Sequence, residues 1–144
     1  MDNNWVQKLF SLWHQADQTT DLEAAFAAFY TDPVLVNGVE MSTSDLVARA
    51  RSLNAGFADL TADILQVVDD GDSLGVASVM RGRHTGPYAG PLGIVQPTGI
   101  DVEIRTIDIL RLTEGKVSTI WVIADDLGLL RQLGAVSESA TESA

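Results

Sequence analysis

The chain has 144 residues, of which 46% are hydrophobic, and its formal net charge is −11 at pH 7. This length predicts one domain with a core of its own, and the acidic excess argues against binding to nucleic acid or to an anionic membrane surface. Because the sequence contains no cysteine, disulfides, thiolate metal ligands and a cysteine nucleophile are excluded.

The first part of the sequence has helical periodicity. Apolar residues spaced three and four apart predict a helix over residues 4–16. The segment Thr19–Glu23 has the composition of a capped start for a second helix, which we expect to end at Asp32-Pro33. A short strand over 34–36 and an Asn37-Gly38 turn follow, and Ser42–Ser44 can cap a third helix that reaches Phe57.

From Leu60 onward the apolar period changes to two, which is typical of strands. The pattern predicts one hairpin from residues 61–68 and 74–83, and a second from residues 100–112 and 117–124. The segment between the two hairpins, Thr85–Gly99, holds three of the four prolines and is predicted to be an ordered loop. A closing helix over 125–133 and a disordered tail over 137–144 complete the prediction.

Helices followed by a run of antiparallel strands indicate an α+β fold, as a single domain over residues 1–136. A strongly curved sheet wrapped around such helices leaves a conical pocket between the two layers. The composition contains no domain linker and no internal repeat.

Several short motifs occur in an order that is similar to one known family. The sharpest is the strand, Glu114-Gly115 turn, strand and helix over residues 109–134; the others are the helix at Trp13, Phe29-Tyr30, the segment 82–86 and the segment 97–99. In this order they resemble the SnoaL-like polyketide cyclases, which have the nuclear-transport-factor-like cone fold. The resemblance implies N-terminal helices in the concave face of a strongly curved mixed or antiparallel sheet, a cone-shaped α+β barrel with a small-molecule cavity.

The sequence departs from the cyclases of that family at one position. Their general acid/base is an Asp on the last strand, seven residues beyond the turn glycine, and here Val122 stands at that distance from Gly115. The same register places Asp108 where the cyclases have a His. The resemblance therefore implies closeness to the ring-hydroxylase members of anthracycline-type pathways, which keep the cavity without the cyclase residues. The acid/base set of the epoxide hydrolases that share the cone fold is not recognisable.

Three residues are candidates for proton transfer. Asp108 is surrounded by apolar residues: facing inward, it would be a carboxylate of raised pKa, whereas facing outward it would pair with a neighbouring arginine. His84, at a predicted strand end near the cavity mouth, either shuttles protons or is structural. Asp125 matches a family acid, but an Asp at a helix start typically caps backbone N–H groups, and the cap is the favoured interpretation.

The remaining candidates would bind substrate. Asn37 matches a family position for a polar residue that orients substrate, although it is also a good turn residue, and Tyr88 could act as a lid that stacks on a flat ring system. Trp13, Val122 and Arg83 complete the predicted set. The tract 69–72 lacks the ligand spacing of a calcium loop, and no metal site or cofactor motif is predicted.

These inferences predict an enzyme that tailors a polycyclic aromatic polyketide in antibiotic biosynthesis, by ring hydroxylation together with a partner reductase. Aldol-type cyclisation, with Asp108 replacing the missing acid, and non-catalytic binding of an apolar molecule, which Val122 favours, are the alternatives. We expect a homodimer formed through the outer face of the sheet. The absence of a leader or membrane-spanning stretch in the sequence predicts a cytoplasmic protein.

Overall fold

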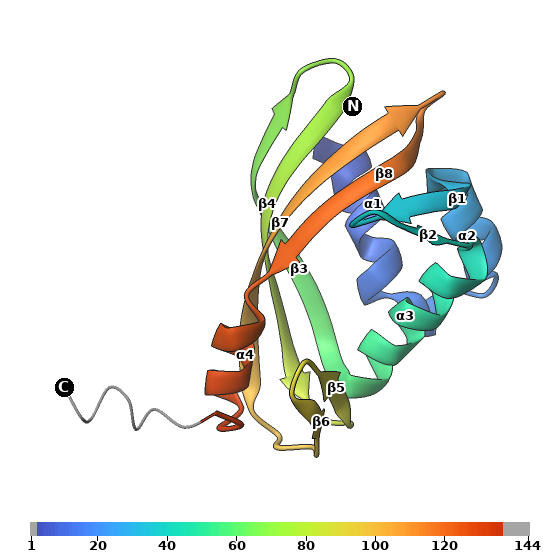
Figure 1. The fold of residues 1–144 in the computed structure, drawn as a ribbon. Coiled ribbons are helices and arrows are strands. Elements are labelled where there is room, and N and C mark those ends of the chain that lie inside the picture. Colours follow the sequence, from blue (N-terminus) through green and yellow to red (C-terminus); the bar gives the residue numbers. More distant parts are fainter. Residues whose placement is uncertain (1–2, 137–144) are drawn as a thin grey trace.

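The computed structural model describes residues 3–136, which form helices on one face of a curved sheet (Figure 1). Three helices, α1 (Asn3–His14), α2 (Leu22–Phe29) and α3 (Thr43–Gly56), precede most of the sheet, with a short 3-10 turn η1 (Ala16–Gln18) between the first two. A fourth helix, α4 (Asp126–Gln132), follows the last strand and contacts β7 (Asp101–Thr113). The α+β architecture predicted from the sequence is confirmed.

The main sheet has six strands in the order β2-β1-β8-β7-β4-β3. The strands are β1 (Tyr30–Val36), β2 (Val39–Met41), β3 (Phe57–Asp69), β4 (Ser73–His84), β7 and β8 (Lys116–Ala124). The sheet is mixed, because β1 pairs with β8 in parallel whereas the other pairs are antiparallel. It stays open, with β2 and β3 at its edges, and does not close into a full barrel.

Irregular pairing accounts for the curvature of the sheet. The ladder between β3 and β4 shifts its register twice, between Ala58 and Thr61 and between Ile64 and Gln66, and the β7–β8 ladder shifts once, next to Arg111. An extra residue on one strand bends that strand and increases its twist. The long strands therefore curve around the helices (Figure 1).

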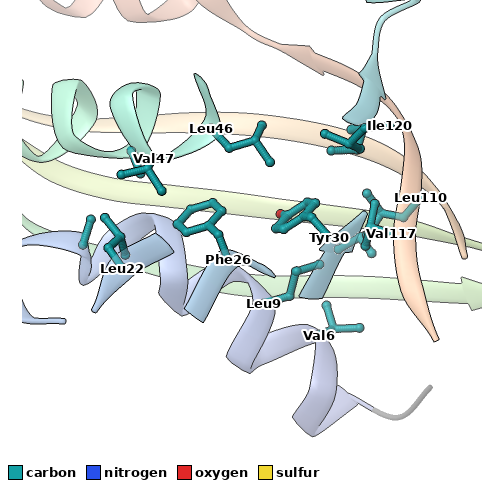
Figure 2. Close-up of a cluster of buried hydrophobic side chains, with 14 of the residues drawn as sticks. Val6, Leu9, Leu22, Phe26, Tyr30, Leu46, Val47, Leu110, Val117 and Ile120 are labelled. Atoms are coloured by element: carbon teal, nitrogen blue, oxygen red, sulfur yellow. The ribbon is translucent and has the colours of Figure 1, made fainter. Parts of the chain in front are cut away.

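The main core joins α1, α2 and α3 to one end of the sheet. Phe26, which is fully buried, stacks on Tyr30 at a centroid distance of 5.6 Å. Side chains from α1, α2 and α3 and from β7 and β8 converge around this pair (Figure 2): Val6, Leu9, Leu22, Leu46, Val47, Leu110, Val117 and Ile120. A second, smaller cluster lies under α4 and includes Phe57, Leu60, Val102, Ile104, Leu129 and Leu133.

The predicted helix starts are confirmed by capping contacts. Asp21 accepts a hydrogen bond from the N–H of Ala24 at 3.1 Å, and Ser42 and Asp45 form a reciprocal capping box at the start of α3. Such caps satisfy N–H groups that have no partner inside the helix, and each contributes about 1 kcal/mol.

Two boundary predictions are wrong, and one short strand was missed. α2 ends at Phe29 rather than at Asp32-Pro33, because Tyr30 already pairs with Val117 and enters the sheet as the first residue of β1. Phe57 belongs to β3 and not to the third helix. β2, which follows the Asn37-Gly38 turn, was not predicted, since three residues are too few for alternation to be visible.

The predicted loop Thr85–Gly99 contains a small hairpin of its own. Its strands are β5 (Tyr88–Gly90) and β6 (Gly93–Val95), which pair with each other and with no other strand. The tail predicted over 137–144 lies outside the described residues. Among the helices of residues 3–136, none is long and apolar enough to cross a membrane.

Candidate active site

A cavity of about 510 Å³ lies between the helices and the concave face of the sheet. One wall comes from α1 and α3, the opposite wall from β4, β7 and β8, and the β5 hairpin closes one side with Pro87, Tyr88 and Ala89. Most lining side chains are apolar or aromatic. A pocket of this size and character suits a mostly apolar small molecule.

Asp108 is the one carboxylate that lines this cavity among the described residues. Alternation along β7 turns it inward, whereas its neighbours Ile107 and Ile109 face outward and are 57% and 49% exposed. Burial raises the pKa of Asp108 from the ordinary value of 3.8 to about 7. Its Oδ1 atom is buried and has no hydrogen-bond partner among residues 3–136. Of the two orientations that the sequence allowed for Asp108, the structure therefore shows the inward one.

The strand register relates Asp108 directly to Val122. The two residues are partners across the β7–β8 ladder, and Val76 is the partner of Asp108 on β4. Side chains of such partners stand about 5 Å apart on the same face of a sheet. The cavity therefore has a carboxyl group on the strand beside Val122, with a valine on either side of it.

A tyrosine that sequence reasoning did not select as a site residue lies near this carboxyl group. Trp13 donates its indole N–H to the hydroxyl oxygen of Tyr30 at 2.9 Å, and both residues line the cavity. Burial, together with the negative charge of Asp108, raises the pKa of Tyr30, so its hydroxyl stays protonated. Because the oxygen already accepts from Trp13, the phenolic proton can be donated to an oxygen of a bound molecule.

His84 is not among the residues that line the cavity. It is fully buried at the end of β4, where its Nδ1 accepts a hydrogen bond from the N–H of Thr98 at 3.2 Å and lies 3.0 Å from the Thr98 hydroxyl. Its ring packs against Phe57 at a centroid distance of 5.4 Å. The expected position at the cavity mouth is wrong, because the residue lies too far along the strand. Instead His84 fixes the end of the 85–99 segment to the sheet.

Asp125 and Asn37 also lie outside the cavity lining, and both bind backbone. Asp125 accepts a hydrogen bond from the N–H of Gly128 at 2.9 Å as the N-cap of α4. Asn37, in a turn with φ of 51°, bonds both main-chain groups of Val122: its Nδ2 donates to the carbonyl at 3.1 Å, and its Oδ1 accepts from the N–H at 2.9 Å. The capping role considered for Asp125 is the one observed, and Asn37 positions the strand that carries Val122.

Arg83 lies on the outer face of the sheet and not in the cavity. Odd-numbered positions near the end of β4 point outward, and Arg83 pairs there with Asp101 at 3.1 Å while remaining half exposed. The predicted contact with substrate is therefore not supported by its position.

Tyr88, by contrast, lines the cavity as predicted. Its ring packs edge-on against Phe57 at 5.7 Å. Partial burial and the nearby negative charge of Asp126 raise the pKa of its phenol. Tyr88 thus connects the β5 hairpin to the first turn of α4 at the edge of the cavity.

Several polar lining residues were not selected from the sequence. Ser78 and Thr106 share the inward face of β4 and β7 with Asp108, and alternation along the strands would have identified them. Arg49 follows Leu46 by three residues and precedes Leu53 by four, so helical spacing places it on the lining face of α3. His14, which was considered as a possible lining residue, does line the cavity, and burial lowers its pKa to about 4.

No group of three metal-ligating side chains occurs within the part of the chain that the structure describes. The chemistry that the site itself offers is proton transfer at one buried carboxyl group, with a neighbouring phenol as hydrogen-bond donor.

The sequence was compared with models of known families. The model described as SnoaL-like polyketide cyclase matches residues 4–133, which is nearly the whole chain. The chain belongs to the SnoaL-like polyketide cyclase family. A comparison with curated protein sequences found no match.

Solved structures agree with the family. TsrD from Streptomyces laurentii is 25% identical with a TM-score of 0.76, over 94% of this chain and 99% of TsrD. AclR, a putative hydroxylase from Streptomyces galilaeus, is 21% identical with a TM-score of 0.74, over 97% of this chain and 90% of AclR. IdmH, a putative polyketide cyclase from Streptomyces antibioticus, is 23% identical with a TM-score of 0.70, over 90% of this chain and 97% of IdmH. The similarity to AclR and IdmH shows that the cone fold is shared. The hydroxylase and cyclase activities are named for AclR and IdmH and are not assigned to this chain by the similarity.

Proposed function

We propose that this SnoaL-like protein catalyses a tailoring step on a polycyclic aromatic polyketide, with Asp108 as the group that transfers the proton. The observation that carries the proposal is a carboxyl group with a pKa of about 7 facing an apolar cavity of about 510 Å³. An acid/base catalyst works best when its pKa lies near the operating pH, because both protonation states are then populated. A carboxyl group exposed to water would be fully ionised and could not act as the acid.

Tyr30 is assigned a supporting role in the same chemistry. Its hydroxyl accepts from Trp13 and keeps its own proton, so it can donate to an oxygen on which negative charge develops. A donor that is held in place before the reaction stabilises such charge without further reorganisation.

The first candidate reaction is ring hydroxylation with a partner reductase. Val122 supports it, because this residue lines the cavity at the position where the cyclases of the family carry their acid. In this reaction one ring C–H becomes C–OH, dioxygen supplies the oxygen and is reduced to water with its other atom, and a reductase delivers two electrons from NADPH through the quinone. Asp108 would remove the proton from the reduced substrate and return it to the oxygen intermediate.

The second candidate is aldol-type cyclisation, which the position of Asp108 opposite Val122 favours. The carboxylate would take a proton from the carbon next to a carbonyl, and the resulting enolate would form a C–C bond with a second carbonyl. The carboxylic acid would then return the proton to the alkoxide. This reaction needs no oxidant and no partner.

We also propose that the protein forms a homodimer through the outer face of the sheet. Four large apolar side chains lie there as two facing pairs, Ile107 with Ile123 and Ile109 with Trp121, and each is roughly half exposed or more. Contiguous apolar surface of this kind is uncommon on monomers. Light scattering after size exclusion tests the proposal: the wild type should have twice the mass of the chain, and Trp121→Lys should have the mass of one chain. A monomeric wild type would refute it.

Mass spectrometry of an anthraquinone-type polyketide incubated with the protein in air tests the two reactions. Parallel samples contain either no reductase or a quinone reductase with NADPH, and each is repeated with Asp108→Asn. A product heavier by one oxygen, formed only with reductase, identifies hydroxylation, whereas an isomer of unchanged mass identifies cyclisation. If the ligand is retained unchanged in every sample, the protein is a binding protein and the proposal fails.

A further inference from the structure

Few of the described residues that line the cavity are charged, and only one of them is permanently positive. Among the described residues that line it, only Asp108, His14 and Arg49 carry ionisable side chains other than the tyrosines. His14 is neutral near pH 7, because burial lowers its pKa to about 4. Arg49 therefore supplies the one permanent positive charge of the lining, in a chain whose net charge is −11.

Arg49 lies on the face of α3 that lines the cavity. Leu46, Arg49 and Leu53 follow one another along a single face of α3, and all three line the cavity. Arg49 is both exposed and part of the lining, which is the arrangement expected of an arginine that keeps its guanidinium in water and its aliphatic stem against an apolar wall. Asp108 belongs to β7 on the opposite wall.

Among the described residues, Arg49 has only a weak charge interaction, with Asp45. It takes part in no ion pair or side-chain hydrogen bond recorded among residues 3–136, although Asp45 lies one helical turn before it. The carboxylate of Asp45 is already engaged, because its Oδ2 accepts the N–H of Ser42 at 3.0 Å. The five donors of the guanidinium are thus available to a group that enters the cavity.

We propose that Arg49 selects aromatic polyketides that carry a carboxylate, binding that group at the cavity opening while the ring system extends towards Asp108. The inference rests on the function proposed above, since it assigns the substrate class of the same site. A carboxylate matches the planar fork of a guanidinium and can accept two parallel hydrogen bonds from it. The acidic surface elsewhere repels an anion, so the orientation with the carboxylate at Arg49 is favoured over the reverse.

Binding of a matched pair of ligands tests this assignment without any turnover. The probes are anthraquinone-2-carboxylate and its methyl ester, which share the ring system and differ in charge. Quenching of tryptophan fluorescence reports occupancy, since Trp13 lines the cavity. The variants are Arg49→Gln, Arg49→Lys and, as the matched control, Arg51→Gln on the same helix, which removes an exposed arginine that does not line the cavity.

At low ionic strength the wild type should bind the carboxylate about fivefold more tightly than the ester, the ratio expected of a partly solvated ion pair. Arg49→Gln should bind the carboxylate no more tightly than the ester, Arg49→Lys should keep part of the preference, and Arg51→Gln should keep all of it. Added salt should reduce the preference of the wild type. Equal binding of both probes by the wild type, or an unchanged preference in Arg49→Gln, would overturn the proposal, as would failure of both probes to bind.

The binding experiment and the activity of Asp108→Asn can refute the two proposals separately. If Asp108→Asn kept full activity, the acid/base role would be refuted while the preference for the carboxylate remained measurable. If the preference were absent but Asp108→Asn were inactive, only the assignment of Arg49 would be lost.

Discussion

Replacement of Asp108 by Asn should make the protein more stable at alkaline pH. In the folded protein burial raises the pKa of this carboxyl group from 3.8 to about 7, so the native state holds its proton more tightly than the unfolded chain does. The free energy of unfolding therefore decreases as the pH rises above the unfolded pKa, and the decrease ends above the folded pKa. Asparagine carries no charge at any of these pH values and avoids the loss.

The magnitude follows from the two pKa values. Linkage at one site gives a destabilisation by Asp108 of about 2 kcal/mol at about pH 5.5 and about 4 kcal/mol at about pH 8.5. The difference in stability between Asp108→Asn and the wild type should therefore grow by about 2 kcal/mol over that interval. Other titrating groups contribute equally to both proteins and cancel in the difference.

Urea denaturation followed by circular dichroism at both pH values measures this difference. Asp72→Asn is the control, because it makes the same chemical change at the exposed turn between β3 and β4. A difference between Asp108→Asn and the wild type that stays constant with pH would show that Asp108 titrates like a solvated carboxyl group. That result would remove the basis for its proposed role.

Three further predictions concern residues outside the cavity. Asn37→Ala should lower the free energy of unfolding by about 2–3 kcal/mol, measured by urea denaturation, since it removes two hydrogen bonds to Val122 and leaves Ala in a left-handed turn. Asn37→Gly also removes the hydrogen bonds but tolerates the left-handed turn, so it should lose less stability. Equal losses in the two variants would show that the turn conformation contributes nothing. Asp125→Ala should cost about 1 kcal/mol of stability with an unchanged catalytic rate, and Asp125→Ser should restore the stability; a large fall in rate would show that Asp125 is more than a cap. Arg83→Gln should leave the Kd for anthraquinone ligands unchanged in fluorescence titrations, because Arg83 pairs with Asp101 on the outer face, and a weaker affinity would place Arg83 in the binding site.

The alternation of side chains between the two faces of each strand predicts much of the site. It allows two orientations for Asp108, and in the inward one, which the structure shows, the carboxyl group lines the cavity. The same parity puts Arg83 on the outer face with Arg81, although this consequence was not drawn from the sequence. For His84 parity predicts the correct face but not the position along the strand, so it could not show that the imidazole lies under the 85–99 segment.

Other features depend on contacts between distant parts of the chain. Asn37 and Val122 are 85 residues apart, and their hydrogen bonds arise only because β1 pairs in parallel with β8. Tyr30 enters the cavity because the chain passes directly from α2 into β1, whereas the sequence favoured a helix that continued to Asp32-Pro33. Local patterns contain no signal for either arrangement, since each depends on tertiary packing.

The most direct test of the proposed chemistry is the single-turnover rate of Asp108→Asn on an aromatic polyketide that the wild type converts, with ligand binding measured on the same samples. This variant should retain the ligand with near wild-type affinity and form product more slowly by about two orders of magnitude or more. A variant that binds and converts the substrate at the wild-type rate would show that Asp108 does not transfer the proton.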